Sequence, residues 1–186
     1  AFVVVEDPCD LAQLDALGQA DDTIIVFTSD HGDMMGDHGL MTKGFMHYRG
    51  TLQPPLVIAD PTRSANRTAS LAGSIDLAPT LLDLAGVDRP AAYEGRSLAP
   101  LLQAARPVEE RPFLVEHRFR HAEIPTSIGV RGSRWVYAIY DSQDPPYEQL
   151  FDLESDPDEL VNLAGEPEYG AILEAQRALC DALRAR

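Results

Sequence analysis

The feature that most constrains the fold of this 186-residue chain is the run of apolar and β-branched residues at 23–28. The run has no polar alternation, which predicts a strand covered on both faces in a parallel sheet. The segment Ser29-Asp30-His31-Gly32 follows it directly. Open α/β sheets bind ligands at the carboxyl ends of their strands, so we expect a functional site at this point.

The patterns on either side predict an α/β region followed by an antiparallel sheet. Leucines at helical spacing predict helices over 10–18 and 76–86, and an apolar run predicts a second buried strand at 56–59. Residues 29–50 show no sustained period, which is typical of a long functional loop. Further elements, four short strands and a closing amphipathic helix, are expected at 113–116, 127–130, 135–140, 149–153 and 171–184.

We therefore predict two domains. Residues 1–105 are expected to form the α/β part, and residues 106–186 a small antiparallel sheet subdomain with a terminal helix. Because strands that would neighbour this sheet are not expected within the chain, an exposed sheet edge should invite self-association.

Charge and composition narrow the expected partners. Thirty acidic and 15 basic residues give a formal charge of -15, which disfavours nucleic acid and anionic membranes. A small anionic substrate remains compatible, because salt screens the global field over roughly 10 Å. Every apolar run is far shorter than the roughly 20 residues that span a bilayer, so we expect no transmembrane helix.

Two further features concern the origin of the chain. The two cysteines, Cys9 and Cys180, are too few to indicate a redox compartment, so the localisation is left open. The chain starts at Ala1 without a basic and apolar leader. We expect it to be a processed product or a fragment.

Asp30 and His31 suggest a metal site on chemical grounds. At the turn from a strand into a loop, a carboxylate and an imidazole on successive residues can converge on one cation. The alternative is structural: Asp30 would cap the following turn, and His31 would be a hydrogen-bonded loop residue.

The wider pattern resembles the sulfatase family of the alkaline phosphatase superfamily, a group that includes arylsulfatases and phosphonate monoester hydrolases. In that family a buried strand leads into Thr-Ser-Asp-His-Gly, followed by Gly-Asp-His-Gly and a lysine. This chain has the matching residues at 28–32, 36–39 and 43. Later matches lie at 55–58, 74–82, 95–98, 150–153 and 156–163, so the resemblance covers roughly residues 10–185. It implies a partial alkaline-phosphatase-like sheet with helices.

The resemblance also implies roles for particular residues. Asp30 and His31 would complete a divalent metal site, with calcium as the first choice and magnesium or manganese as alternatives. Lys43 would hold an oxygen of a small anionic ester and act in catalysis. His47 would line the substrate pocket.

Several nearby residues are expected to have structural roles. The loop glycines Gly32, Gly36 and Gly39 should allow positive φ or a close backbone approach. His38 should shape the loop by hydrogen bonding, and Asp76 and Asp152 should be helix and turn caps. Four further residues form a basic cluster that either contacts an anionic substrate or is a solvated face: His117, Arg118, Arg120 and His121.

The family nucleophile is missing from this chain. The resemblance implies a formylglycine, made from a cysteine or serine in a Cys-x-Pro-x-Arg type motif, upstream of the Asp-His pair. The sequence after Cys9 lacks both the proline and the arginine, and Cys180 lies in the terminal helix on the wrong side of the pair. The family's Tyr-Glu and later Arg-x-Pro are replaced by Tyr48-Arg49 and Gln53-Pro54-Pro55, so we expect an ion pair there to be lost.

Three interpretations follow. In the first, the chain is part of a sulfate ester hydrolase, contributes part of a metal site and a substrate lysine, and is inactive alone. In the second, the parent enzyme cleaves phosphonate or phosphate esters. In the third, the chain is a truncated or pseudoenzyme module without catalysis, so whether it is an enzyme is left open.

Overall fold

The computed structural model describes residues 2–4, 8–103, 111–119, 121 and 123–185. The chain folds into two compact units that interleave in sequence. The first joins the segment ending at Asp30 to the one beginning at Pro54, and the second joins His31–Gln53 to the C-terminal segment. The domain division at about residue 105 stays a prediction, because it concerns the domains of a parent enzyme.

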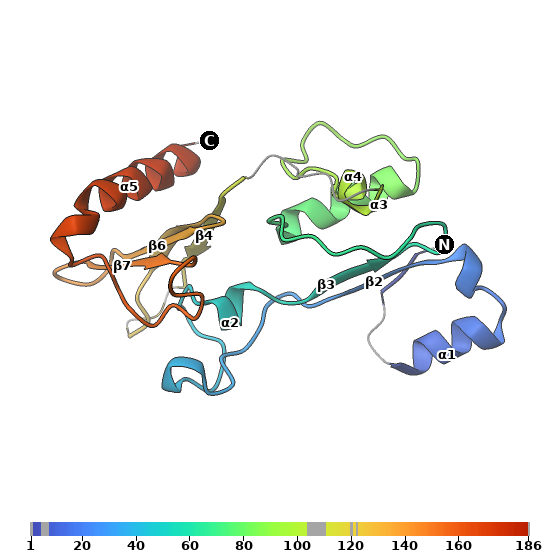
Figure 1. Cartoon of the computed structure of the whole chain (residues 1–186), viewed down its shortest axis with the longest axis horizontal. Coiled ribbons are helices and arrows are strands. Elements are labelled where there is room, and N and C mark those ends of the chain that lie inside the picture. The colour runs from blue at the N-terminus through green and yellow to red at the C-terminus, as the bar shows by residue number, and fades with distance from the viewer. Residues whose placement is uncertain (1, 5–7, 104–110, 120, 122, 186) are drawn as a thin grey trace. The chain divides into compact units, whose positions relative to one another are not determined.

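The first unit contains a three-stranded mixed sheet in the order β1-β2-β3. Strand β2, Ile24–Thr28, pairs parallel to β1, Phe2–Val4, and antiparallel to β3, Leu56–Ala59. Figure 1 shows α1 on one side of these strands and α3 and α4 on the other. The bounds of the helices in this unit are α1 Pro8–Ala16, η1 Ala20–Asp22, η3 Ser74–Asp76, α3 Leu77–Leu84 and α4 Ala99–Gln103.

The predicted strands at 23–28 and 56–59 are confirmed, but the expectation that both are buried was wrong. Val26 is buried, whereas the next residue, Phe27, is 47% exposed. Its cross-strand partner Val57 is 54% exposed, and the two share one face of the sheet. An apolar run shows that its residues favour burial. It does not show how many layers of the chain cover the strand.

The second unit contains a four-stranded antiparallel sheet in the order β4-β5-β6-β7. Figure 1 shows the long C-terminal helix α5 lying along this sheet. The predicted strands and helix are confirmed, and the bounds are β4 Phe113–His117, β5 Ser127–Arg131, β6 Trp135–Tyr140, β7 Tyr147–Asp152 and α5 Gly170–Arg184. The short helices are η2 Asp37–Gly39, α2 Arg49–Leu52 and η4 Pro167–Tyr169.

The core of the second unit lies between the sheet and α5. Leu150 of β7 is fully buried and packs with side chains of β5 and β6 against Leu173 and Cys180 of α5. Ile172 and Leu179 of α5 pack against the same cluster, so one face of the predicted amphipathic helix is turned to the sheet. Among the described helices, none combines the length and apolar character that a bilayer crossing requires.

We expect Leu150→Ala to destabilise the second unit. Removing a fully buried leucine leaves a cavity and should lower the free energy of unfolding by about 2–5 kcal/mol. The matched control is Leu160→Ala, because Leu160 is 70% exposed and should change the stability by less than about 0.5 kcal/mol. Urea unfolding followed by tryptophan fluorescence measures both. Equal effects of the two substitutions would contradict this packing.

Candidate functional site

The loop after β2 is shaped by glycines, as the sequence predicts. The Gly32 N–H donates to the Thr51 carbonyl at 2.9 Å, and a Cβ at Gly32 would lie 2.0 Å from the Gly50 carbonyl oxygen. No other residue fits such a close backbone approach. Gly36 and Gly39 have φ of 109° and 73°, a region that glycine occupies without strain.

Within the second unit, the loop brings Lys43 back to His31. The Lys43 Nζ atom lies 2.5 Å from His31 Nε2, and the Lys43 backbone N–H donates to the Asp33 carboxylate at 2.5 Å. An ammonium can only donate, so Nε2 is the acceptor and Nδ1 carries the proton. Nδ1 then donates to the Gly32 carbonyl at 2.9 Å. Two residues predicted to act together are thus in direct contact.

The other predicted metal ligand, Asp30, belongs to the first unit. Its carboxylate accepts a hydrogen bond from the Ser29 hydroxyl at 3.3 Å. The convergence of Asp30 and His31 on one cation stays a prediction. Among the described residues, no group of three or more His, Cys, Asp or Glu side chains is arranged to hold a metal ion.

His47 is buried in the second unit, with only 4% of its surface exposed. Its Nε2 lies 2.9 Å from the Ser127 hydroxyl oxygen of β5. Burial, together with the neighbouring His117, lowers the pKa of His47 from 6.5 to about 4. The observed partner of His47 is therefore the sheet, and its contact with a substrate stays a prediction.

Tyr48 links the loop to the sheet and to His38. Its hydroxyl accepts a hydrogen bond from the Gln149 side-chain amide at 2.9 Å. The His38 ring stacks on the Tyr48 ring with a centroid distance of 3.8 Å and an interplanar angle of 9°. His38 was expected to shape the loop by hydrogen bonding; the contact seen for its ring is this stacking, at a φ of 52°.

Arg49, the first residue of α2, contacts the segment before α5. Its backbone N–H donates to Glu159 at 2.6 Å, and its guanidinium lies 3.6 Å from the Asp158 carboxylate. The ion pair expected to be lost at Tyr48-Arg49 joins the family's glutamate to a later arginine, and the Arg49–Asp158 contact is a different pair.

Glu159 was missed as a key residue. It is 1% exposed, and its other carboxylate oxygen lies 2.6 Å from Nη1 of Arg131 on β5. One carboxylate therefore joins α2 to the four-stranded sheet. The motif at 156–163 that carried part of the family resemblance contains Glu159, so that motif was the signal that could have indicated it.

The two predicted caps accept backbone hydrogen bonds. The buried Asp76 carboxylate accepts the N–H groups of Gly73 and Arg96 at 3.1 and 2.9 Å. Asp152 accepts the Glu154 N–H at 3.2 Å and is also paired with Arg134. Both residues therefore hold turns together.

The expected basic cluster is only partly described. Arg118 pairs with Glu116 at 3.0 Å, which neutralises its charge locally, and His121 is exposed. Arg120 lies outside the described residues. Of the two alternatives left open for this group, a solvated face is the one that the Arg118 contact favours.

Comparison with known proteins identifies the class to which this fold and loop belong. The chain belongs to the sulfatase family of the alkaline phosphatase superfamily, and corresponds to its C-terminal portion. The matching family model is described as "N-sulphoglucosamine sulphohydrolase, C-terminal", and it covers residues 36–185.

Three relatives illustrate the match. A choline-sulfatase of Rhizobium meliloti is 40% identical over 151 residues, 79% of this chain and 28% of the relative. A protein solved in complex with its substrate D-glucosamine-2-N,6-O-disulfate superposes with a TM-score of 0.83 at 27% identity, covering 95% of this chain and 37% of the other. A phosphonate monoester hydrolase from Silicibacter pomeroyi has a TM-score of 0.76 at 30% identity, covering 96% and 37%. The chain spans about a third of the length of the curated relatives it matches.

We expect His47 to make the stability of the second unit depend on pH. With its folded pKa at about 4, the unfolded state binds an extra proton as the pH falls from about 6.5 to 4. The stability from neutral His47 is thus complete above pH 6.5 and is lost toward pH 4, by up to about 3 kcal/mol.

Urea unfolding of His47→Gln at pH 4.5 and 7 tests this expectation. The variant should lose most of the pH dependence in this window that the native chain shows. His121→Gln is the matched control, because His121 is exposed, and it should keep that dependence. An unchanged slope in His47→Gln would contradict the assignment.

We expect Glu159→Gln to destabilise the second unit by about 3 kcal/mol. The amide keeps the size of the side chain but leaves the Arg131 guanidinium, 11% exposed, without its counter-charge. Asp158→Asn removes an equal charge from a 73% exposed neighbour and should cost less than about 1 kcal/mol. Thermal and urea unfolding compare the pair, and similar losses would argue against a buried ion pair.

Proposed function

We propose that this chain is the C-terminal portion of a metal-dependent sulfate ester hydrolase and is inactive alone. In this proposal Asp30 and His31 contribute to a divalent metal site, and Lys43 binds an oxygen of a small anionic ester. The observation that carries it is the contact between Lys43 Nζ and His31 Nε2.

The loop geometry supports the role of Lys43. Lys43 is the only lysine in a chain of net charge -15, and the Asp33 carboxylate fixes its backbone. A cation held in place in advance stabilises charge that develops on an ester oxygen without reorganising during the reaction. A flexible surface lysine would not need such a constraint.

The arrangement of His31 fits a metal ligand. Its Nδ1 proton is directed to the Gly32 carbonyl, so Nε2 is the ring atom that would bind a cation, in exchange for its contact with Lys43 Nζ. One imidazole and one carboxylate form an incomplete set, so the remaining ligands would come from another part of the enzyme. Calcium is the metal we propose, with magnesium or manganese as alternatives; when bound, it would polarise the ester oxygen.

Inactivity of the chain alone follows from its chemistry. Polarisation of an ester oxygen does not by itself supply a group to attack sulfur. The formylglycine of the family would stand upstream of the Asp-His pair, in a segment that this sequence does not include. The proposed chain is therefore one part of a divided active site.

A second candidate is the hydrolysis of phosphonate esters. The likeness to the phosphonate monoester hydrolase at 30% identity favours it. Sulfate and phosphonate esters are both tetrahedral anions, and neither Lys43 nor an Asp-His pair distinguishes sulfur from phosphorus.

We expect Lys43→Ala to lower kcat/KM for 4-nitrophenyl sulfate about 100- to 1,000-fold in an enzyme that joins this chain to the upstream nucleophile segment. Arg67→Ala is the control, since it removes the same charge from an exposed position. The 186-residue chain alone should give no turnover.

Two outcomes would contradict the proposal. Hydrolysis by the isolated chain would show that the nucleophile is inside it, and equal activity of Lys43→Ala and Arg67→Ala would remove Lys43 from the site. A rate that is higher on a matched aryl phosphonate would favour the second candidate. No rate on either ester would favour a module without catalysis.

A further inference from the structure

The loop after β2 contains a closed turn, residues 34–41, with His38 at its bend. A backbone hydrogen bond joins the two arms of the turn, from the Gly36 N–H to the Leu40 carbonyl at 2.7 Å. The φ of His38 is 52°, in the left-handed region that residues other than glycine rarely adopt. Such conformations persist where nearby contacts maintain them, and they collect at functional sites. A contact of the His38 ring is therefore expected to compensate for this backbone.

That contact is the stack of the His38 ring on the Tyr48 ring. At a centroid distance of 3.8 Å and an interplanar angle of 9°, it is the shortest and most nearly parallel ring contact among the described residues. His38 is exposed, so burial does not force its ring into this position. Stacking of the two rings is itself favourable, and it holds the bend of the turn on Tyr48.

Tyr48 is a fixed support for this stack. Gln149 of β7 donates a side-chain hydrogen bond to the Tyr48 hydroxyl oxygen at 2.9 Å. The ring of Phe151, on the same strand, lies 5.9 Å from the Tyr48 ring. The His38 ring therefore rests on a side chain that is anchored to the four-stranded sheet.

The 34–41 turn also contacts α2 at the start of its first arm. Met34 is 1% exposed, and its sulfur accepts a hydrogen bond from the Thr51 hydroxyl at 3.3 Å. A Cβ at Gly50 would lie 3.2 Å from that sulfur and 3.4 Å from the Asp37 carboxylate. The turn is thus held at its start by Met34 and at its bend by His38.

Lys43 lies where it responds to the position of this turn. The second arm ends at Met41, whose carbonyl accepts the Met35 N–H at 3.2 Å, and Lys43 follows two residues later. The Lys43 N–H donates to the carboxylate of Asp33, the residue directly before the turn. A displacement of the turn would therefore move both of the segments that fix the backbone of Lys43.

We infer that His38 is a positioning residue, whose stack on Tyr48 holds the 34–41 turn in place and thereby fixes Lys43 for binding an anionic ester. The inference rests on the proposed function, in which Lys43 binds an oxygen of that ester. A lysine side chain is long and flexible, so a fixed backbone narrows the positions that Nζ can reach. His38 acts through Lys43 and is assigned no contact with the substrate.

The first test is the exchange of the Lys43 amide proton with water in the 186-residue chain. His38→Asn removes the ring but keeps a residue type that tolerates a positive φ. Exchange at Lys43 should become about two- to tenfold faster, because the stack no longer opposes opening of the turn. NMR of the ¹⁵N-labelled chain measures the rate, and the same spectra show that the variant is folded.

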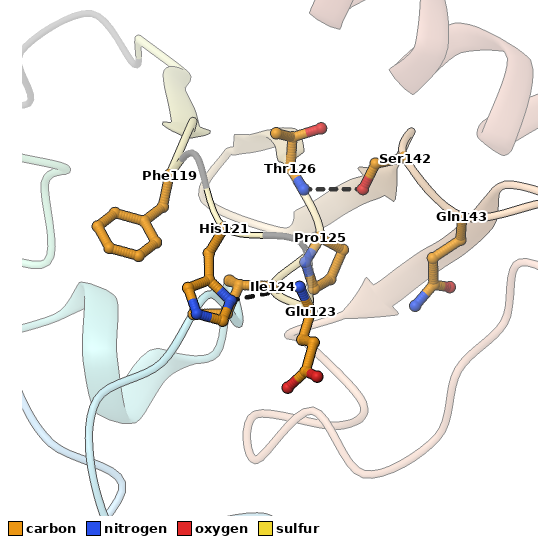
Figure 2. A pocket seen from close by; sticks show the side chains of 8 residues that line it. All are labelled: Phe119, His121, Glu123, Ile124, Pro125, Thr126, Ser142 and Gln143. Carbon is orange, nitrogen blue, oxygen red and sulfur yellow. Dashed lines mark hydrogen bonds between the residues drawn. The ribbon is translucent and has the colours of Figure 1, made fainter.

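His121→Asn is the matched control. The His121 ring also lies beside an aromatic ring, that of Phe119, at a centroid distance of 6.2 Å and an interplanar angle of 16° (Figure 2). Neither residue belongs to the loop that carries Lys43, so the same substitution should leave the exchange at Lys43 unchanged.

The second test is a double-mutant cycle in the enzyme that joins this chain to the upstream nucleophile segment. His38→Asn should lower kcat/KM for 4-nitrophenyl sulfate about two- to tenfold. In a Lys43→Ala background the same substitution should change kcat/KM by less than about twofold, because the group that it positions is gone. General damage to the unit would lower the activity equally in both backgrounds.

Three results would overturn the inference: native exchange at Lys43 in His38→Asn, equal acceleration by His121→Asn, or equal losses of activity with and without Lys43. The exchange measurement needs no turnover. If Lys43→Ala proved as active as Arg67→Ala, the proposed function would fail, while the exchange rate would still decide whether the stack fixes Lys43.

Discussion

The placement of the candidate site depends on the docking of residues 47–49 onto the four-stranded sheet. Three hydrogen bonds fix this short segment: His47 to Ser127, Tyr48 to Gln149 and the Arg49 N–H to Glu159. The partners are 80, 101 and 110 residues apart in sequence. Closing such long loops costs conformational entropy, so these bonds depend on the rest of the unit being folded. The loop that carries Lys43 is held at one end by this docking.

Burial makes these contacts specific. His47 stays neutral because desolvation lowers its pKa, and a neutral ring can share a hydrogen bond with the Ser127 hydroxyl. Glu159 stays compatible with burial because Arg131 supplies a counter-charge and Arg49 an N–H donor. A buried ion pair adds little net stability compared with apolar residues, but removing one partner is costly. The pair is therefore costly to break without being a large source of net stability.

Much of the fold was predictable from local sequence. The strand at 24–28, the antiparallel strands after residue 112 and α5 followed from hydrophobic period and composition. The number of layers that cover the first sheet could not be predicted in this way, because the exposure of Phe27 and Val57 depends on what packs over them. At the site, the loop glycines were predicted from the sequence, whereas Lys43 and His31 were predicted as a substrate lysine and a metal ligand and not as direct partners. The burial of His47 and the role of Glu159 were not predicted, because their partners Ser127 and Arg49 lie 80 and 110 residues away in sequence.

The charge of the chain explains why one lysine carries so much of the proposed chemistry. At a net charge of -15 the long-range field disfavours an anionic ester, and salt screens this field beyond about 8–10 Å. Binding must therefore come from contacts at short range. In the second unit, Arg118, Arg131 and Arg134 are all committed to carboxylates. Lys43 instead contacts the neutral acceptor His31 Nε2, so its charge is not cancelled by an acid at that contact and can act on an anionic ester.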